Sequence, residues 1–490
     1  MASTGKDLID EIRQCLRALK RDSPKIERLY DYAEGRHDPP YIPDSADSEF
    51  RLLAKRSITN LFPLLIDSTA QALYVDDYRH GNASRSELTG RQDASRFWEH
   101  WQASRLDAKQ GPIYRAALVT GMAFMVTEKT PFGILSRGLS PRRTTALFSD
   151  PSQGLEPDVA LYVERFPTSR KPGRAKFWDD TNVYDIDYTT QWDSTKRADA
   201  IRVAKTVPHG AKECPVTRVP CHVDLDGNVT GLVEPLIPTQ NRVNQSVFDL
   251  LIAQTNTSFE VRTVTGMAPP TKKVLNQNTG EWEEELDENG NPIPDQVAIS
   301  AKRWLFAEDP DVKFDHLPAG SLAGIIEAIE LGMRHFSAIG QIPPHYMLGE
   351  IVNVNAEALK AASVALERKN QEIAASFGEA IERVMRIFAQ MAGIAVADGE
   401  YGEVVWRDLS TSSLAQTADA LGKFRDSLGI PAEGLWGRVP GVTRQELREW
   451  KELVEAQRGE DGWMASLFTP AVDDAVASDS QETALELSRG

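Results

Sequence analysis

The stretch IPPHYMLGEIVNVNAEALKAA, residues 342–362, decides how this chain is organised. Pro343 and Pro344 must end any helix before them, because proline removes an N–H donor and clashes with the preceding turn. Residues 345–354 then carry almost no charge, and we expect a loop there. Asn355 follows as a residue well suited to cap a new helix. The stretch therefore predicts a helix, a nearly neutral loop and a second helix in succession.

The helix after Asn355 is long. Its pattern continues for roughly 37 residues, well beyond a typical globular helix. The apolar residues that share its seam are Leu359, Leu366, Ile373, Phe377, Ile381, Val384 and Phe388. A short strand, GEVVWRDL, follows at 402–409, and a helical hairpin is expected from 413 to 456. Residues 459–490 are acidic and rich in Ser and Asp, a composition typical of disorder.

Two amphipathic helices precede the loop and bracket a small β-rich segment. The first is predicted at 237–258, with an apolar stripe of Val243, Val247, Leu250 and Leu251 and with Asn241, Asn244, Gln245 and Asp249 elsewhere. The second is predicted at 318–341, capped near Ser321, with Leu322, Ile325, Ile326 and Ile329 on its stripe. Between them, DENGNP marks a hairpin tip. Two such helices cannot bury both stripes within one thin hairpin, so copies of the same helices are the natural partners.

The first 236 residues predict a larger base of helices followed by strands. Leu8, Ile12, Leu16 and Leu19 share one helix face, and a second short helix is expected around 26–30, ending at Gly35. Phe97, Trp98 and Trp101 have helix-face spacing, which favours core packing over a ligand box. Short alternating runs from about 123 to 236, with DLDGNV as a turn, predict antiparallel strands. The fold class is therefore α+β.

Composition excludes several classes of protein. The 490 residues include 72 acidic and 55 basic side chains, and the net charge of −17 argues against a protein that grips DNA through its phosphates. The negative charge does not exclude a protein past which DNA moves without adhering to it. The three cysteines, Cys15, Cys214 and Cys221, indicate a reducing compartment without disulfides and are interpreted as buried apolar residues. No run approaches the roughly 18 apolar residues of a membrane span, and the N-terminus is no signal peptide.

No catalytic, metal-binding or cofactor-binding pattern stands out. Cys214, Cys221 and His222 are the best zinc candidates, but their spacing lacks a Cys-x-x-Cys or His-x-x-x-His pair. The serine of GSLAG at 320–324 is explained by helix capping, and acidic turns such as Asp76–Asp77 and 309–315 are typical of solvated surface. His345 lacks a second partner for acid–base chemistry. We therefore expect no enzyme, no cofactor and no bound metal.

The order of these parts resembles the portal proteins of tailed double-stranded DNA bacteriophages, of the siphophage type. The residues that carry the resemblance are EPLIPTQNRVNQSVFDLL at 234–251 and IPPHYMLGEIVNVNAEALKAASVALERKNQE at 342–372. The resemblance implies a portal fold with the wing at 1–236, stem helices at 237–258 and 318–341, the clip at 259–317, the tunnel loop at 342–354, the long wing helix and returning strand at 355–410, the crown at 411–458 and a tail at 459–490.

The resemblance also implies function. Such a protein forms a ring of about twelve subunits, a dodecamer, at one capsid vertex. Through this head–tail connector the viral genome is packaged and ejected. The implied partners are other copies of the chain, double-stranded DNA without sequence specificity, the terminase large subunit, a head–tail adaptor, and the major capsid and scaffold proteins. The implied location is the virion, with assembly in the host cytoplasm.

The tunnel loop would face the DNA, with Leu348, Gly349, Glu350, Ile351, Val352, Asn353 and Val354 as its residues. Its one charge, Glu350, leaves mostly apolar and amide groups, which touch a duplex without counterion-release binding and suit a seal or one-way brake. Viewed alone, the same stretch reads as an ordinary helix connector. In the clip, Lys272, Lys273, Arg303 and Trp304 are candidate partner contacts, although they are equally compatible with solvated hairpin residues.

Two other interpretations compete with the portal. One is a cytosolic enzyme whose dispersed site follows no recognisable motif. The other is a different structural ring of the head–tail junction, although such chains are usually much shorter and lack this order of helix, β tip, helix and long helix. The portal interpretation depends on whether the two stem stripes are covered within one subunit.

Overall fold

The structure is a computed structural model. It describes residues 5–42, 48–79, 96–152, 154, 156–193, 200–258, 262–265, 271–275, 280, 282–287, 290, 292–293, 313–316, 322–349, 356–394, 402–407, 414–439, 442, 446–447 and 449–457. The chain divides into two units, residues 1–407 and 408–490.

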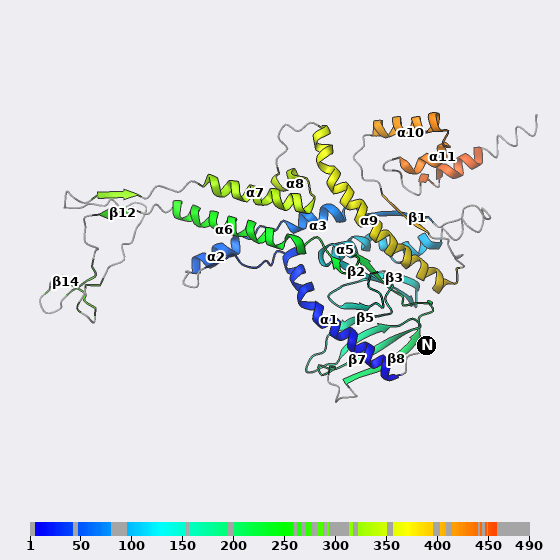
Figure 1. Cartoon of the computed structure of the whole chain (residues 1–490), viewed down its shortest axis with the longest axis horizontal. Helices are drawn as coiled ribbons and strands as arrows, with labels where there is room; N and C mark the ends of the chain where they lie inside the picture. Colours follow the sequence, from blue (N-terminus) through cyan, green and yellow to red (C-terminus); the bar gives the residue numbers. More distant parts are fainter. Residues whose placement is uncertain are drawn as a thin grey trace, which may run out of the picture. The chain divides into compact units, whose positions relative to one another are not determined.

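The first unit mixes helices and antiparallel strands, as expected for an α+β protein (Figure 1). Its elements up to the stem are α1 (Gly5–Ala33), α2 (Ser48–Arg56), α3 (Phe62–Ala70), β1 (Val75–Arg79), a helix at 96–103, α5 (Leu106–Thr120), β2 (Met122–Thr130), β3 (Gly133–Leu139), β4 (Thr144–Leu147), β5 (Val159–Arg165), β6 (Gly173–Trp178), β7 (Asn182–Tyr188), β8 (Ile201–Pro208), β9 (Val216–Pro220), β10 (His222–Val223), β11 (Val229–Thr230) and η2 (Glu234–Leu236).

The remaining elements of this unit begin with the predicted stem. They are α6 (Ile237–Ser258), β12 (Arg262–Thr265), β13 (Lys273–Leu275), β14 (Trp282–Glu284), β15 (Lys313–His316), α7 (Ala323–Gly340), α8 (Pro344–Leu348), α9 (Ala356–Ala392) and β16 (Glu403–Trp406). The second unit contains α10 (Leu414–Leu428), α11 (Ala432–Leu435), η3 (Trp436–Arg438) and helical residues at 446–447 and 449–457, in the region where a helical hairpin was predicted. The acidic segment 459–490 lies outside the described residues.

Helix α1 is one continuous helix, so the prediction of two separate helices is wrong. Pro24 lies inside it. A proline in a helix costs a hydrogen bond and strains the preceding turn, but each half of α1 has its own core to pack against. Ile12 and Leu16 pack on the five-stranded sheet, whereas Leu29 lies in the main core. This burial on both sides of Pro24 offsets the local cost.

Two antiparallel sheets form the β part of the base. Their strand orders are β4-β5-β6-β7-β8 and β3-β2-β9. In β7, the alternate residues Tyr184, Ile186 and Tyr188 are buried, which is the period of two expected for a sheet with one covered face. The predicted DLDGNV turn joins β10 to β11, with Gly227 at φ +81°. Glycine is favoured there because other residues are strained at positive φ.

Helix α9 crosses the base and organises the main core (Figure 1). Six of the seven seam residues predicted for it are buried, namely Leu366, Ile373, Phe377, Ile381, Val384 and Phe388; the side chain of Leu359 lies outside the described residues. Phe97 and Trp101 are buried in the same core and Trp98 packs against it, so the core interpretation of these aromatic residues is confirmed. Strand β16 returns after α9 and pairs antiparallel with β1.

Arg383 fixes α9 to strand β9 from inside the protein. Its side chain is completely buried. The guanidinium donates hydrogen bonds to the backbone oxygens of Val216 and Cys214, to Thr217 Oγ1, and to Glu213 Oε2 at 2.9 Å. A buried charge is tolerated only with such partners, because desolvation costs several kcal/mol. Arg383 therefore sets the register between α9 and the sheet.

Replacing Arg383 with leucine should strongly destabilise the first unit. The change leaves the buried backbone carbonyls of Val216 and Cys214 without this donor, and each unsatisfied buried acceptor typically costs about 1–3 kcal/mol. We expect a clear fall in the urea concentration at the unfolding midpoint, followed by circular dichroism. Arg368→Leu is the matched control, because Arg368 is exposed on the same helix. Equal losses in both variants would contradict the proposed role of Arg383.

Candidate functional site

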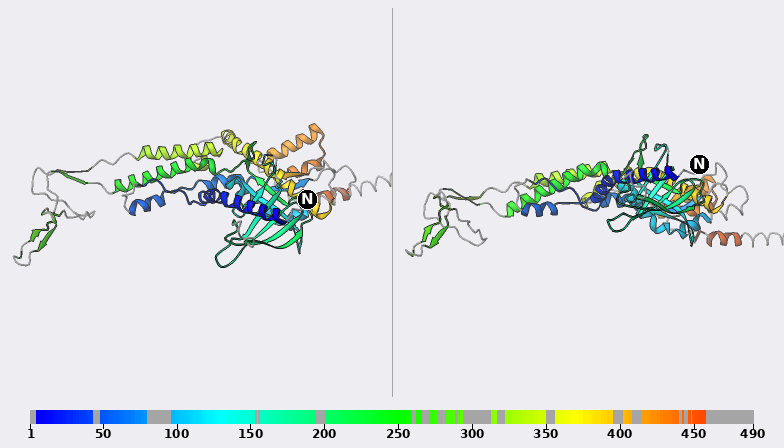
Figure 2. Two further views of the ribbon diagram at one scale, coloured as in Figure 1. Left: turned by 60° about the horizontal axis from the view of Figure 1, so that its bottom comes forward. Right: turned by 90° about the horizontal axis from the view of Figure 1, so that it is seen from below.

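The two predicted stem helices exist and lie side by side (Figures 1 and 2). Helix α6 has the predicted bounds. Helix α7 begins at Ala323 after an N-cap at Leu322, and Ser321, the predicted cap, lies outside the described residues. Gly332 permits the two helices to approach closely, because a Cβ atom there would lie 2.9 Å from Val243 Cγ2. The crossing point of the stem is therefore set by a glycine facing a valine.

The predicted apolar stripes are only partly covered by the chain itself. Val243 is buried in the main core beside Phe336. The other stripe residues that are half-buried are Val247, Leu250, Leu251, Leu322, Ile325 and Ile329. Ile326 is 44% exposed, and two further residues of α7, Leu331 and Ile339, are 50% and 54% exposed. The stem is thus anchored at its base and leaves large apolar side chains in solvent.

A buried amide cluster anchors the base of α6, which the sequence did not indicate. Gln240 Oε1 accepts a hydrogen bond from the Leu61 amide at 3.1 Å, and Gln240 Nε2 donates to Thr59 O at 2.6 Å. Asn244 Oδ1 accepts from the Thr59 amide at 3.1 Å. Both side chains are fully or almost fully buried. These bonds satisfy the backbone of the segment before α3 and hold α6 against it.

His37 completes this cluster in one defined tautomer. Burial lowers the pKa of His37, which favours the neutral ring. Its Nε2 lies 2.9 Å from Tyr32 O, and its Nδ1 lies 2.9 Å from Asn244 Nδ2. A carbonyl can only accept and an amide nitrogen can only donate, so the proton must be on Nε2. His37 therefore links α1 to the stem as part of the structure.

The junction after α7 differs from the prediction. The loop was expected from residue 345, but Pro344–Leu348 form the short helix α8. Proline fits the first position of a helix, because its fixed φ suits the turn and its missing N–H has no intrahelical partner there. Gln341 at φ +52° separates α7 from α8, and Gly349 at φ +68° ends α8 with its amide donating to His345 O at 3.1 Å. Helix α8 therefore occupies the first residues of the predicted loop and ends at Leu348.

The remaining candidate residues are placed as follows. Leu348 is half-buried and Gly349 is exposed, whereas Glu350, Ile351, Val352, Asn353 and Val354 lie outside the described residues. In the segment predicted as the clip, β12 pairs with β15 and β13 pairs with β14. Lys273 is the first residue of β13 and Lys272 precedes it, and both are exposed. Arg303 and Trp304 lie outside the described residues. The bridge between Leu286 and Pro292 agrees with the hairpin tip predicted at DENGNP.

Lys369 is a further residue that sequence reasoning missed. It is 6% exposed, and its Nζ donates to Gly340 O, at the end of α7, at 2.9 Å. Burial lowers its pKa to about 8. The sequence pattern could have identified Lys369 as a buried residue. It lies three residues after Leu366 and four before Ile373, so it falls within the apolar seam of α9. Lys369 therefore links α9 to the junction between α7 and α8.

The zinc candidates do not converge. Cys214 and Cys221 belong to different core clusters, and burial raises the pKa of each thiol to about 12, which keeps both protonated. His222 instead lies 3.7 Å from Glu372. Among the described residues, no group of three or more His, Cys, Asp or Glu side chains could hold a metal ion. Asp76 pairs with Arg407 at 2.8 Å, which fits the surface interpretation of that acidic turn.

These features define a structural protein, in which a helix pair is fixed at its base and presents apolar side chains outward. A family model described as "Phage portal protein, SPP1 Gp6-like" matches residues 12–460. The chain belongs to this family of phage portal proteins. It is 25% identical over 405 residues to a protein named "Portal protein" from Mycobacterium phage D29, covering 79% of this chain and 78% of that protein. It is 26% identical over 408 residues to the "Portal protein" of Mycobacterium phage L5, covering 79% and 77%.

Family membership confirms the resemblance drawn from residues 234–251 and 342–372. Portal proteins are structural virion components at a capsid vertex; they assemble into rings and associate with the capsid and the DNA-packaging machinery. The family is not enzymatic, so the alternative of a cytosolic enzyme is not supported. None of the helices in the described part of the chain is long and apolar enough to cross a membrane.

Lys369→Met should make stability less dependent on pH between about 8 and 10.5. In this window the unfolded state still binds the lysine proton, whereas the buried amine has lost it, so wild-type stability rises with pH. A pKa lowered from 10.5 to about 8 corresponds to roughly 3 kcal/mol, and the variant should lack this rise. The free energy of unfolding is measured with urea from pH 7 to 10, with Lys55→Met, at an exposed lysine, as the control. If this free energy changed with pH equally in wild type and in Lys369→Met, Lys369 would not have a lowered pKa.

Proposed function

We propose that this chain forms a closed ring of about twelve copies around a DNA channel, with α6 and α7 packed against the same helices of both neighbours. The observation that carries the proposal is the arrangement of exposed apolar residues on α7. At about 100° per residue, Leu331 and Ile339 each lie about 140° from Ile326 around the helix axis, in opposite directions. Apolar side chains therefore project from opposite sides of α7, and a ring member has a neighbour on each side.

Ring closure also fits the anchoring of the stem. The amides of Gln240 and Asn244 and the side chain of Phe336 hold the bases of α6 and α7, so the exposed residues cannot turn inward without breaking buried contacts. Burying a large aliphatic side chain stabilises an interface by about 1.5–3 kcal/mol. Two such surfaces per subunit, one on each side, make a heterologous contact that closes on itself.

Electrostatics supports a channel that DNA passes without adhering. At −17 per chain, about twelve chains carry roughly −200, which repels phosphates. We infer that residues 349–354 form the tunnel loop and face the DNA. Gly349 supports a movable hinge, because its φ of +68° suits glycine and, within the described part of the chain, a Cβ atom added there would meet nothing within 4 Å beyond its chain neighbours. The loop would seal or brake the duplex through van der Waals contact.

The remaining regions follow the same architecture. We assign 1–236 to the wing, 259–317 to the clip, 355–410 to the long wing helix and its returning strand, and 411–458 to the crown. In the clip, Lys272, Lys273, Arg303 and Trp304 would meet the terminase large subunit and later a head–tail adaptor. Trp282 of β14, 67% exposed, adds an aromatic side chain to that surface. Capsid and scaffold proteins would contact the ring during assembly in the host cytoplasm.

Charge placed on either side of α7 should block ring closure. Ile326→Asp and Leu331→Asp each put a carboxylate into one of the two proposed contacts, where burial of an unpaired charge is strongly unfavourable. We expect each variant to remain a monomer or an open oligomer in mass photometry and negative-stain microscopy. Leu428→Asp, on the 66%-exposed Leu428 of α10, is the control and should still form rings. Closed rings from both α7 variants would exclude these residues from the subunit contact.

A cation in the tunnel loop should impair packaging without preventing assembly. Val352→Lys would let the loop bind phosphate and retard the duplex, because each lysine–phosphate contact releases counterions. We expect normal rings by microscopy and a severalfold fall in packaged DNA when the variant complements a portal-deficient phage. Val352→Thr, which keeps the size and stays neutral, is the control. Normal packaging with Val352→Lys would show that the loop does not face the DNA.

A further inference from the structure

The hairpin between β5 and β6 is strongly basic in an acidic chain. Residues 165–176 read RFPTSRKPGRAK, with five basic and no acidic side chains, whereas the whole chain carries a net charge of −17. Two of the five basic residues are already paired, Arg174 with Asp187 at 3.8 Å and Lys176 with Glu128 at 3.3 Å. Arg165, Arg170 and Lys171 remain exposed. Ion pairs within the described part of the chain therefore do not account for these three positive charges.

Backbone contacts hold two of the cations at this end of the sheet in place without neutralising them. Arg165 donates to Pro172 O through Nε and Nη2, at 3.2 and 2.9 Å. Arg143, exposed just before β4, donates to Glu164 O at 3.1 Å. Within the described part of the chain, none of Arg143, Arg165, Arg170 and Lys171 has a carboxylate within ion-pair distance. Four unpaired cations therefore share one end of the five-stranded sheet.

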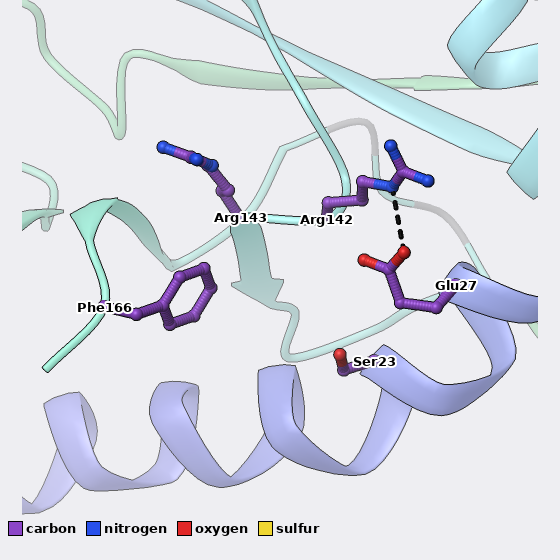
Figure 3. A pocket seen from close by; sticks show the side chains of 5 residues that line it. All are labelled: Ser23, Glu27, Arg142, Arg143 and Phe166. Carbon is purple, nitrogen blue, oxygen red and sulfur yellow. Dashed lines mark ion pairs between the residues drawn. The ribbon is translucent and has the colours of Figure 1, made fainter. Parts of the chain in front are cut away.

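An open pocket lies beside this basic end. It has a volume of about 430 Å³ and is lined by Ser23, Glu27, Arg142, Arg143 and Phe166. Figure 3 shows Arg143 and Phe166 on one side, and Arg142 paired with Glu27 of α1 on the other. Arg142 also pairs with Glu34 and stacks over the Tyr30 ring at 3.9 Å, so it is neutralised. Arg143 is left as the charged group of the pocket, next to Phe166, which is 49% exposed.

We propose that this pocket and the basic hairpin form a docking surface for an acidic segment of another protein, in which a carboxylate lies next to an apolar side chain. The carboxylate would pair with Arg143, whose planar guanidinium can bind it through two parallel hydrogen bonds. The apolar side chain would cover Phe166. Arg165, Arg170 and Lys171 would attract further acidic residues of the same segment. Arginine and aromatic side chains together are typical of the energetic centres of protein interfaces.

A protein partner fits these observations better than nucleic acid does. Four phosphate contacts would lose roughly 100-fold in affinity between 50 and 200 mM salt, on a chain that repels DNA overall. The pocket is also lined by Glu27, and Glu164, next to Arg165 in the chain, is exposed. Both carboxylates oppose a continuous phosphate backbone. A peptide can place one carboxylate at Arg143 and avoid both. The surface lies on the wing hairpin, so this inference does not depend on ring closure or on the tunnel loop.

A designed peptide tests the surface directly. The probe is a fluorescein-labelled pentapeptide, Glu-Leu-Glu-Phe-Glu, titrated with the full chain in a fluorescence anisotropy assay at low salt. We expect Arg143→Glu to weaken binding at least tenfold and Phe166→Ser to weaken it severalfold. Arg51→Glu, an equal charge change on exposed α2, should leave it unchanged. The matching Lys-Leu-Lys-Phe-Lys peptide should bind Arg143→Glu more tightly than it binds wild type.

Three results would overturn the proposal. The first is equal binding of a Gln-Leu-Gln-Phe-Gln peptide, which would remove the role of charge. The second is unchanged affinity in Arg143→Glu, with circular dichroism confirming that the variant is folded. The third is an Arg143-dependent affinity for a 20-base-pair duplex without affinity for the acidic peptide, which would assign the surface to nucleic acid. Arg143 and Phe166 are exposed, so loss of folding is not expected in either variant.

Discussion

The stem helices are fixed at one end and uncovered along the rest, and the structure depends on this asymmetry. Gln240 and Asn244 bury their amides against the segment before α3, and Phe336 packs into the main core. Because these contacts fix the helices, the exposed apolar residues of α7 cannot become buried within their own subunit. In the ring that we propose, a helix pair held this way gains further stability from contact with neighbouring copies.

Helix α9 connects the stem helices to the sheet. Arg383 ties α9 to β9 and to the residues just before that strand through four hydrogen bonds. Lys369, fourteen residues earlier on the same helix, donates a hydrogen bond to the last carbonyl of α7. The Lys369–Gly340 contact lies next to Gln341, which has a left-handed conformation. Helix α9 thus connects the end of α7 to β9, and in the proposed portal architecture this connection joins the start of the tunnel loop to the sheet of the wing.

The sequence predicted features that depend on local patterns and missed features that depend on contacts between distant residues. Periodicity predicted α6 with its bounds and the seam of α9, because long helices repeat the same signal over many turns. It failed at Pro24, where packing against two different cores outweighs the local preference. It also missed Gln240 and Lys369, whose partners lie 179 and 29 residues away. A buried polar residue can be understood only once its partner is known, although Lys369 could have been found as a charge on an apolar seam.

The charge of the chain acts against assembly and in favour of function. Subunits at −17 repel one another, but salt screens exposed charges beyond about 8 Å at physiological ionic strength. Apolar contact between stem helices acts at a shorter range than this screening length. The proposed ring can therefore close once neighbouring subunits touch. In the proposed channel, the same negative charge would keep phosphates from adhering as the duplex moves. The placement of the basic side chains is therefore informative. Arg383 and Lys369 are buried, whereas the cluster around Arg143 is exposed at one end of the five-stranded sheet, where we propose that it binds an acidic partner.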